Sequence, residues 1–273
     1  MSRILASGRA EFLIALRNRW VTIAVVMMAL FSMVLSAAGS APTGALGADK
    51  LSVTVASLTS LAVYLVPLVA LLMSFDAVAG EVERGTLPLV LTYPVSRAEL
   101  LLGKFTAHLA ILALAVAVGY GIAVIAAMIM DPRAALGIPA LVRLFWTSLL
   151  LGATFLGIGY AISAFARRPG AAAGLVIGLW LVLIVLYDLG LLAAIVADDG
   201  GVFTTQVFPW LLLGNPADAF RLYNLAASEA TAAAAGIAGA ANSIPQIHAL
   251  ASIMLWPVAA FGLALMAFRK VTP

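Results

Sequence analysis

The stretch LLLGKFTAHLAILALAVAVGYGIAVIAAMIM (residues 100–130) is too long and too apolar for a surface helix of a soluble protein. A bilayer core of about 30 Å is crossed by roughly 20 apolar residues in a helix. Because residues 109–130 include no charged side chain, they meet that requirement. The stretch therefore predicts a membrane-spanning helix whose first turns lie in the headgroup layer or the cytosol.

The rest of the 273-residue chain has the same character. Hydrophobic residues make up 64% of it and charged residues 10%, whereas a soluble domain carries about 25% charged residues. So few charges cannot cover the core of such a chain with a polar surface, and lipid is the solvent that fits. We predict an all-α membrane protein, a single domain over residues 1–273, with six spans near 20–38, 53–75, 100–130, 141–165, 171–196 and 250–268.

The basic residues indicate how the spans are oriented. If the N-terminus is cytosolic, eleven of the 15 Lys and Arg residues flank the spans on the cytosolic side and four lie outside. Such a bias is the positive-inside rule. It predicts a multi-pass membrane protein with both termini in the cytosol, and the family resemblance described below implies the bacterial inner membrane.

Residues 2–19, ahead of the first span, carry apolar side chains on one broad helical face, although Arg9 shares it. This pattern favours an interfacial helix on the cytosolic membrane surface, and an ordinary polar tail is the alternative. We expect the first span to be a retained helix, because its apolar stretch is longer than that of a signal peptide.

Residues 76–105, DAVAGEVERGTLPLVLTYPVSRAELLLGKF, are the most charged stretch after the N-terminus. Gly85 and Thr86 can begin a short helix with Pro88 in its first turn. Tyr93 and Pro94 break that helix, and Ser96 begins the next one with capping-box spacing. We predict a cytosolic segment, residues 76–99, with a short amphipathic helix suited to docking on a partner. A solvated loop is the alternative.

The same stretch resembles the segment after the second span of ABC-2-type transporter permeases. The pattern ExExGTLxxxLxxPxSRxxLLxGK carries the resemblance. It implies an ABC-2 (type V exporter-like) permease whose short helix is the coupling helix that contacts a cytosolic ATPase. The residues that it assigns to ATPase coupling are Glu81, Glu83, Arg84, Gly85, Thr86, Pro94 and Arg97.

The sequence carries no ATPase motif of its own. A P-loop ending at Gly103-Lys104 requires glycine at position 98 and Ser or Thr at position 105. Those positions hold Ala98 and Phe105. We therefore expect this chain not to be an enzyme, and we expect ATP hydrolysis on a separate subunit.

A narrower resemblance, to the permeases that serve the maturation of nitrous oxide reductase, is spread along the chain. Its strings are RNRW (17–20), TVASLTSLA (54–62), FDAVAGEVERGTL (75–87), LVLTYPVSR (89–97), LLGKFTAH (101–108) and GNPADAFRLYN (214–224). It implies a complex of two permeases, an ATPase dimer and a periplasmic protein, without nucleic acid. It also implies that this complex handles copper, or sulfur for the copper cluster, while this chain binds no cofactor.

Two features inside the fifth span are candidates for function. Asp188 is an ionisable residue in a spanning segment, which is costly unless paired or solvated; a hydrogen-bonded packing role is the alternative. Gly170, Gly174 and Gly178 repeat at four-residue spacing and favour close helix contact. That contact is with a helix of the same chain or with a second copy.

Residues 198–248 form the longest non-spanning stretch. Asn215 and Pro216 fit the N-cap and first residue of a helix. We predict short helices parallel to the outer membrane face, and the narrower resemblance implies that Phe220, Arg221 and Tyr223 meet a periplasmic partner. A re-entrant pair packed on its own spans is the alternative.

The sequence contains no cysteine and no metal-ligand spacing around His108 or His248, so we predict no metal site. Met130 and Asp131 are the one pair that we would test as a soft-metal contact. An ABC-2 exporter of a lipid, glycan or drug remains an alternative function, because it shares the 76–99 segment. A stand-alone secondary transporter is a second alternative and would depend on Asp188.

Overall fold

A computed structural model describes residues 50–92, 95–226 and 245–271, together with positions 26, 27, 30 and 34. The predicted interfacial helix (2–19) lies outside the described residues, as does most of the predicted first span. Pro94 and residues 227–244 also lie outside them.

The described residues fold into helices without any strand, which confirms the all-α prediction. Five of the helical stretches are long and apolar enough to cross a membrane, and they match the last five predicted spans to within a few residues. They are α3 (Lys50–Ser74), α6 (Arg97–Met130), α7 (Ile138–Ala166), the continuous stretch α8–η3–α9 (Pro169–Trp180, Leu181–Leu186 and Tyr187–Asp198), and α14 (Gln246–Arg269).

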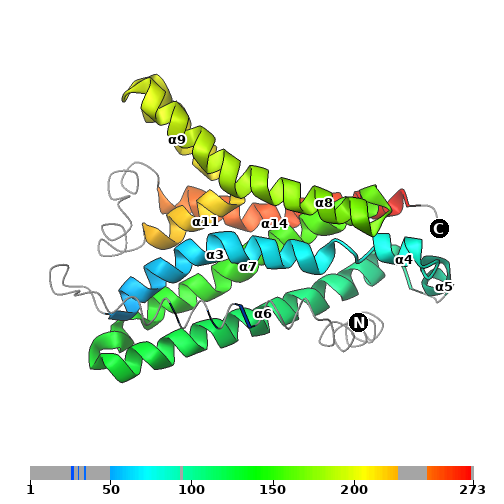
Figure 1. Ribbon diagram of the computed structural model, residues 1–273, viewed down its shortest axis with the longest axis horizontal. Coiled ribbons are helices and arrows are strands. Elements are labelled where there is room, and N and C mark those ends of the chain that lie inside the picture. The colour runs from blue at the N-terminus through cyan, green and yellow to red at the C-terminus, as the bar shows by residue number, and fades with distance from the viewer. Residues whose placement is uncertain are drawn as a thin grey trace.

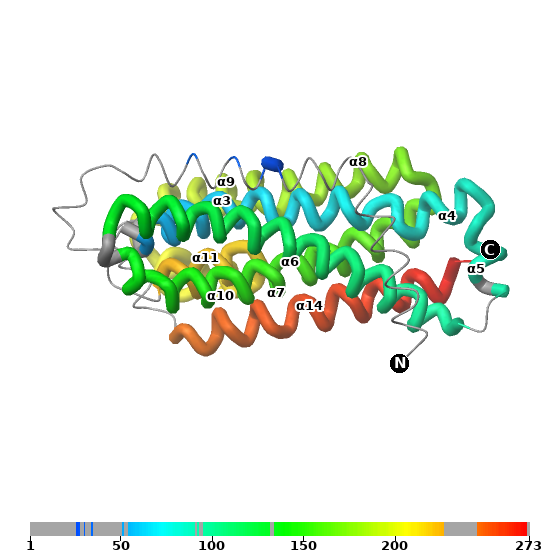
Figure 2. The backbone as a smooth tube through the Cα atoms, turned by 90° about the horizontal axis from the view of Figure 1, so that it is seen from below, coloured from blue at the N-terminus to red at the C-terminus, as the bar shows by residue number. Residues whose placement is uncertain are grey.

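These helices lie side by side as an elongated bundle (Figure 1). One end carries the short helices α4 (Ala79–Glu83) and α5 (Leu87–Leu91) and the C-terminus; we call it the α4–α5 end. The turn η2 (Pro132–Gly137), which joins α6 to α7, lies at the opposite end. Figure 2 shows the same arrangement from below, with α14 running along α7.

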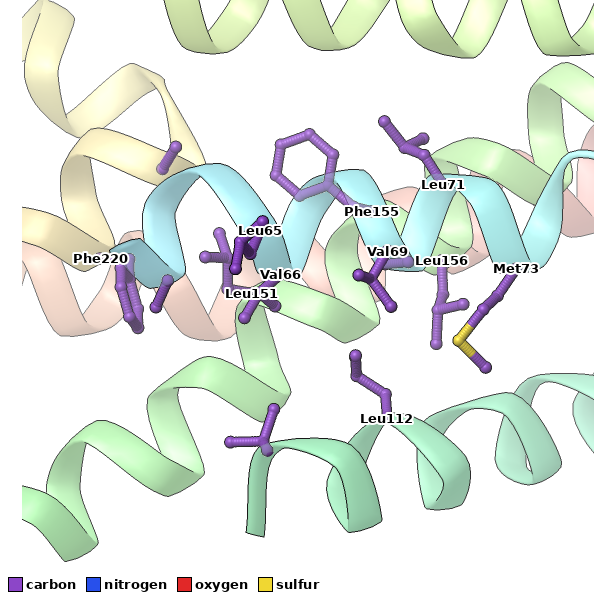
Figure 3. Close-up of a cluster of buried hydrophobic side chains, with 14 of the residues drawn as sticks. Leu65, Val66, Val69, Leu71, Met73, Leu112, Leu151, Phe155, Leu156 and Phe220 are labelled. Atoms are coloured by element: carbon purple, nitrogen blue, oxygen red, sulfur yellow. The ribbon is translucent and has the colours of Figure 1, made fainter. Parts of the chain in front are cut away.

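The interior is formed mainly where α3, α6 and α7 meet. Val66, Val69, Leu112, Phe155 and Leu156 interdigitate there, and all are buried (Figure 3). In the span that includes α3, the most apolar stretch of 18 residues is 67% buried inside the protein. The corresponding stretch of α8–η3–α9 is only 11% buried. Thus α3 is a central helix, and the fifth span lies at the edge of the bundle.

Glycines of α7 let its neighbours approach closely. A Cβ on Gly157 would lie 2.9 Å from backbone atoms of Ala260 in α14, and one on Gly159 would overlap Ser74 of α3. By contrast, a Cβ on Gly170, Gly174 or Gly178 would meet nothing within 4 Å. The predicted close contact of this glycine stripe with a helix of the same chain is therefore not observed among the described residues. The other alternative, contact with a second copy, stays a prediction.

The fifth span bends away from the bundle toward α9 (Figure 1). The six residues of η3, Leu181–Leu186, form a wider π-helical turn in its middle. Such turns are a usual cause of bends in long helices. The bend opens the space that the next elements occupy.

The elements after α9 return into that space. They are η4 (Phe203–Val207), α10 (Phe208–Gly214) and α11 (Pro216–Leu225). At the α10–α11 junction, Nδ2 of Asn215 donates to the carbonyl of Leu183 at 2.7 Å. Leu183 lies about 20 Å from either end of its helix at a rise of about 1.5 Å per residue, so the junction reaches the middle of the span.

The prediction of helices parallel to the outer membrane face is therefore wrong for residues 203–225. Helix α10 runs inward along α9, where the Tyr187 hydroxyl donates to the carbonyl of Leu211 at 2.8 Å. Helix α11 then runs back outward between α3, α7 and α14. The described part is a re-entrant helical hairpin, which was the alternative, and we call α10–α11 the hairpin.

Candidate coupling site

Helix α4 is attached to α7 by a capping interaction that bridges distant parts of the sequence. The backbone amides of Val78 and Ala79 donate to Oγ of Ser163 at 3.1 and 2.9 Å. Free amides at a helix N-terminus need such acceptors. Because α4 supplies no side-chain cap of its own, Ser163 fixes where α4 begins on the bundle.

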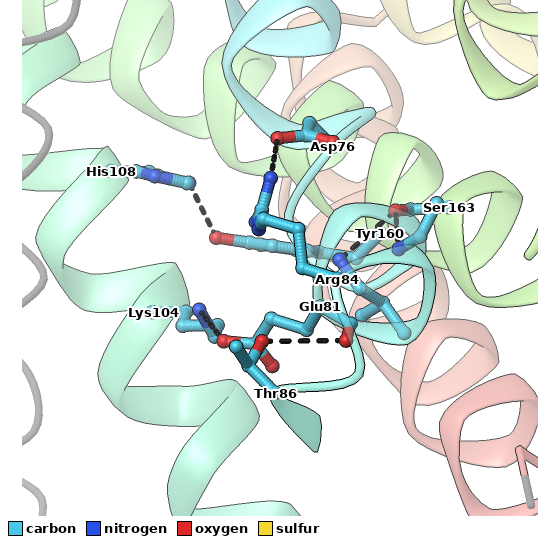
Figure 4. Close-up of polar contacts among 10 residues, drawn as sticks. Asp76, Glu81, Arg84, Thr86, Lys104, His108, Tyr160 and Ser163 are labelled. Atoms are coloured by element: carbon cyan, nitrogen blue, oxygen red, sulfur yellow. Dashed lines mark hydrogen bonds and ion pairs between the residues drawn. The ribbon is translucent and has the colours of Figure 1, made fainter. Parts of the chain in front are cut away.

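A buried ion pair fixes the other side of α4. Nζ of Lys104 in α6 lies 2.8 Å from Oε1 of Glu81, and their side chains are 6% and 14% exposed. The Thr86 hydroxyl also donates to the carbonyl of Glu81 at 3.3 Å. Figure 4 shows Glu81 pointing into the bundle toward Lys104. Glu81 therefore binds within the chain and is not presented to a partner.

A second polar pair lies deeper under α4. The Tyr160 hydroxyl and Nδ1 of His108 are 2.6 Å apart, and their rings stack (Figure 4). Both side chains are buried, and His108 lies one helical turn beyond Lys104 on α6. Thus α4 rests on a layer of polar contacts that joins α6 to α7.

The turn between α4 and α5 is the exposed part of the segment. Glu83 and Arg84 are exposed, and Gly85 takes the left-handed conformation with φ of 65°. Arg84 reaches back to Asp76 at 3.3 Å, but both side chains remain about half exposed. On α5, Leu89 is 64% exposed. We call Glu83, Arg84, Gly85, Pro88 and Leu89 the docking face.

The helix starts predicted in this segment are confirmed. Helix α5 begins after Thr86 and has Pro88 in its first turn. Ser96 and Glu99 form both hydrogen bonds of a capping box at the start of α6, at 3.2 and 2.8 Å.

Arg97 joins the segment to the last helix. Its Nη1 donates to the carbonyls of Phe268 and Val271 at 2.8 and 2.6 Å, and its guanidinium lies 5.6 Å from the centroid of the Phe268 ring. These carbonyls belong to the C-terminal end of α14, which a cation stabilises. Arg97 thus ties the start of α6 to the end of α14.

The residues assigned to ATPase coupling therefore separate into two groups. Glu83, Arg84 and Gly85 lie on the docking face, whereas Glu81 and Arg97 hold the segment on the bundle. Thr86 bonds to the Glu81 carbonyl within the segment, and Pro94 lies outside the described residues. Nothing in the sequence pattern distinguishes the two groups, since Lys104, the partner of Glu81, and Phe268, a partner of Arg97, lie on other helices.

Asp188 is paired, and its partner is a residue that the sequence pattern assigns to a periplasmic contact. Nη2 of Arg221 lies 2.9 Å from Oδ2 of Asp188, and Nη1 lies 3.2 Å from Oδ1 of Asp218. The hairpin brings Arg221 to the fifth span. Spacing along one helix gives no sign of this pair, because 33 positions separate its members.

The other hairpin residues predicted to meet a periplasmic partner lie mostly inside the chain. Phe220 is 0% exposed and belongs to the main core, so the structure corrects its assignment as a partner contact. Tyr223 is partly buried and packs edge-on against Trp146 of α7. Asn224 is buried and donates to the Thr147 hydroxyl at 3.0 Å. Helix α11 is amphipathic because one side enters the core.

The described residues include no group of three or more His, Asp or Glu side chains placed to hold a metal ion. Met130 and Asp131 lie at the end of α6 beside η2.

Five helices apolar and long enough to cross a membrane, with the docking face at one end of their bundle, are the architecture of a multi-pass membrane protein. The model of the ABC-2 family transporter proteins matches residues 5–271, and the chain belongs to that family. It is 44% identical over 268 residues to the probable ABC transporter permease protein NosY of Pseudomonas aeruginosa, with 96% of each chain covered. It is 38% identical over 279 residues to the protein of the same description from Stutzerimonas stutzeri, with 99% of each covered.

Proposed function

We propose that this chain is the permease of an ABC transporter that couples cytosolic ATP hydrolysis to copper or sulfur delivery for nitrous oxide reductase. The two NosY relatives, alike over nearly their whole length, support this assignment. In this proposal an ATPase dimer resembling NosF binds the α4–α5 end. A periplasmic protein resembling NosD binds the opposite end and receives the copper or sulfur.

The observation that carries the ATPase part is the contrast between the two sides of the coupling segment. The docking face is exposed, whereas Glu81, Ser163 and Arg97 attach the segment to α6, α7 and α14. A partner that pushes on the docking face therefore moves three spanning helices together. A solvated loop without these anchors would move by itself and would not displace the spanning helices.

Glu83 offers the cleanest test, because its side chain is exposed and forms no ion pair among the described residues. The complex is purified from native membranes with wild-type chain, with Glu83→Lys, or with Asp199→Asn. Asp199 is exposed at the opposite end and serves as the control. We expect Glu83→Lys to lower the recovered ATPase and its activity by about 10-fold, which corresponds to about 1.4 kcal/mol. Full recovery with Glu83→Lys would overturn the proposed docking face.

A second copy of the chain is the other partner that we propose. Three features on or beside the fifth span lack cover among the described residues: the glycine stripe of α8, Tyr64 at 40% exposed, and the partly exposed pair Asp188–Arg221. Charged groups in a membrane face protein or water rather than lipid. We therefore place the second copy, and a polar space between the copies, on this side.

A further inference from the structure

The ion pairs of the hairpin leave one negative charge unbalanced. Arg221 donates from Nη2 to Asp188 and from Nη1 to Asp218, at 2.9 and 3.2 Å. Two carboxylates therefore share one guanidinium. With all three groups ionised, the cluster carries a net charge of −1 within a largely apolar hairpin.

Asp218 is poorly placed to carry that charge. Its side chain is 2% exposed, and its Oδ2 is buried without a hydrogen-bond partner among the described residues. A buried, unpaired carboxylate oxygen is strongly unfavourable. A proton on Oδ2 removes the charge and makes this oxygen a donor. The carboxyl group of Asp188, which shares the Arg221 guanidinium with Asp218, is an acceptor for that hydrogen bond.

No other group facing the cluster supplies the missing positive charge within the described part of the chain. Tyr187 of α9 and Tyr64 of α3 lie within electrostatic reach, but phenols are neutral at ordinary pH. Arg143 of α7 faces Tyr223, and His248 of α14 packs against Trp210. Helices α8 and α10 and the turn η3 contain no ionisable side chain.

A metal ion fits the cluster less well than a proton does. The guanidinium of Arg221 occupies one oxygen of each carboxylate, and its positive charge repels a cation. Divalent ions in proteins also need more oxygen ligands than two carboxylates provide. A proton needs only the free oxygen of Asp218 and an acceptor beside it.

We propose that Asp188 and Asp218 bind one exchangeable proton, held between the fifth span and the hairpin. Asp218 carries the proton on Oδ2, Asp188 accepts the hydrogen bond, and Arg221 neutralises the remaining charge. The side chains of Asp188 and Arg221 are 27% and 26% exposed, so the proton can exchange with the polar space that we place beside them in the proposed function. This site is independent of ATPase docking, which lies at the other end of the bundle.

Infrared spectroscopy of the full chain in lipid nanodiscs tests this site. We expect the wild type at neutral pH to show the C=O band of a protonated carboxyl group, which disappears on alkaline titration. Asp218→Asn and Asp188→Asn should each abolish the band, because the remaining carboxylate is then neutralised by Arg221. Glu83→Gln, the control, should keep it. Absence of the band in the wild type, or its survival in either Asn variant, would overturn the proposal.

A change of cations distinguishes a bound proton from a bound metal ion. The band should be unchanged when sodium is replaced by choline and EDTA is added, because a proton site does not depend on either ion. A change in the band would assign the site to a metal cation and overturn the proposal.

The pH dependence of stability gives a second, independent measurement. The folded chain holds a proton that the unfolded chain releases above about pH 4, so the unfolding temperature of the wild type should fall as pH rises. Asp218→Asn resembles the protonated acid and should fold normally with a smaller pH dependence. An equal dependence in both would contradict a proton site at Asp218.

Discussion

Nζ of Lys104 lies 2.8 Å from Oε1 of Glu81, and both side chains are almost wholly buried. The pair joins α4, whose last residue Glu83 belongs to the docking face, to the long spanning helix α6. A buried pair of this kind holds two elements in one relative position, because separating them leaves an uncompensated charge.

Removal of one charge of this pair should destabilise the chain. We expect Glu81→Gln to lower the free energy of unfolding by about 3 to 5 kcal/mol, since Lys104 then remains buried without its counter-ion. Thermal unfolding in detergent measures the loss. The exposed Glu83→Gln should change stability by less than about 0.5 kcal/mol.

The double variant Glu81→Gln with Lys104→Met separates pairing from a general effect of mutation. It removes both charges, so we expect less destabilisation than the sum of the two single variants. Strict additivity would show that the two side chains do not interact.

Arg97 should control the order of the last turn of α14. Arg97→Lys keeps the charge but loses the planar guanidinium that binds Phe268 and Val271. We expect faster hydrogen exchange in residues 268–271 and a loss of about 1 to 3 kcal/mol. Arg84→Lys, at an exposed pair, is the matched control. Unchanged exchange in the Arg97 variant would contradict a clamp on α14.

The two sets of glycines should respond differently to the same substitution. Gly157→Leu forces α7 away from the backbone of Ala260, and overpacking of this kind costs about 1 to 3 kcal/mol or more. Gly174→Leu meets open space, so the single chain should fold as well as the wild type. Thermal unfolding compares the variants. Crosslinking of the Gly174 variant also measures whether the stripe is needed for self-association.

The depth of the hairpin can be measured with cysteines, because the chain has none of its own. Single variants place a cysteine at Gly214, near the α10–α11 junction, and at Asp199, in the exposed turn after α9. A membrane-impermeant maleimide should label Asp199→Cys in intact membranes and leave Gly214→Cys unlabelled. Equal labelling would place the hairpin on the membrane surface.

The spans were predictable because each signal is local. Uninterrupted apolar stretches set the helices, and Ser96 and Glu99 mark the start of α6 through contacts only three residues apart. The break at Asn215 and the start at Pro216 follow from the same short-range rules.

The roles of individual side chains were not predictable for the opposite reason. Glu81 and Glu83 are two positions apart in one charged stretch, yet one points to Lys104 and the other to solvent. Phe220 could meet lipid, a partner or the core, and an amphipathic pattern suits all three. Only the tertiary fold, which brings Arg221 to Asp188 and inserts the hairpin at Leu183, settles such choices.

Site-specific crosslinking from Leu89 tests the central claim most directly. Leu89 is 64% exposed on α5, belongs to the docking face and forms no part of the anchors. A photoreactive residue at position 89 should crosslink the ATPase in native membranes, and the same residue at position 199 should not. If position 89 yields no ATPase crosslink in membranes where the assembled complex hydrolyses ATP, the α4–α5 segment is not the coupling site.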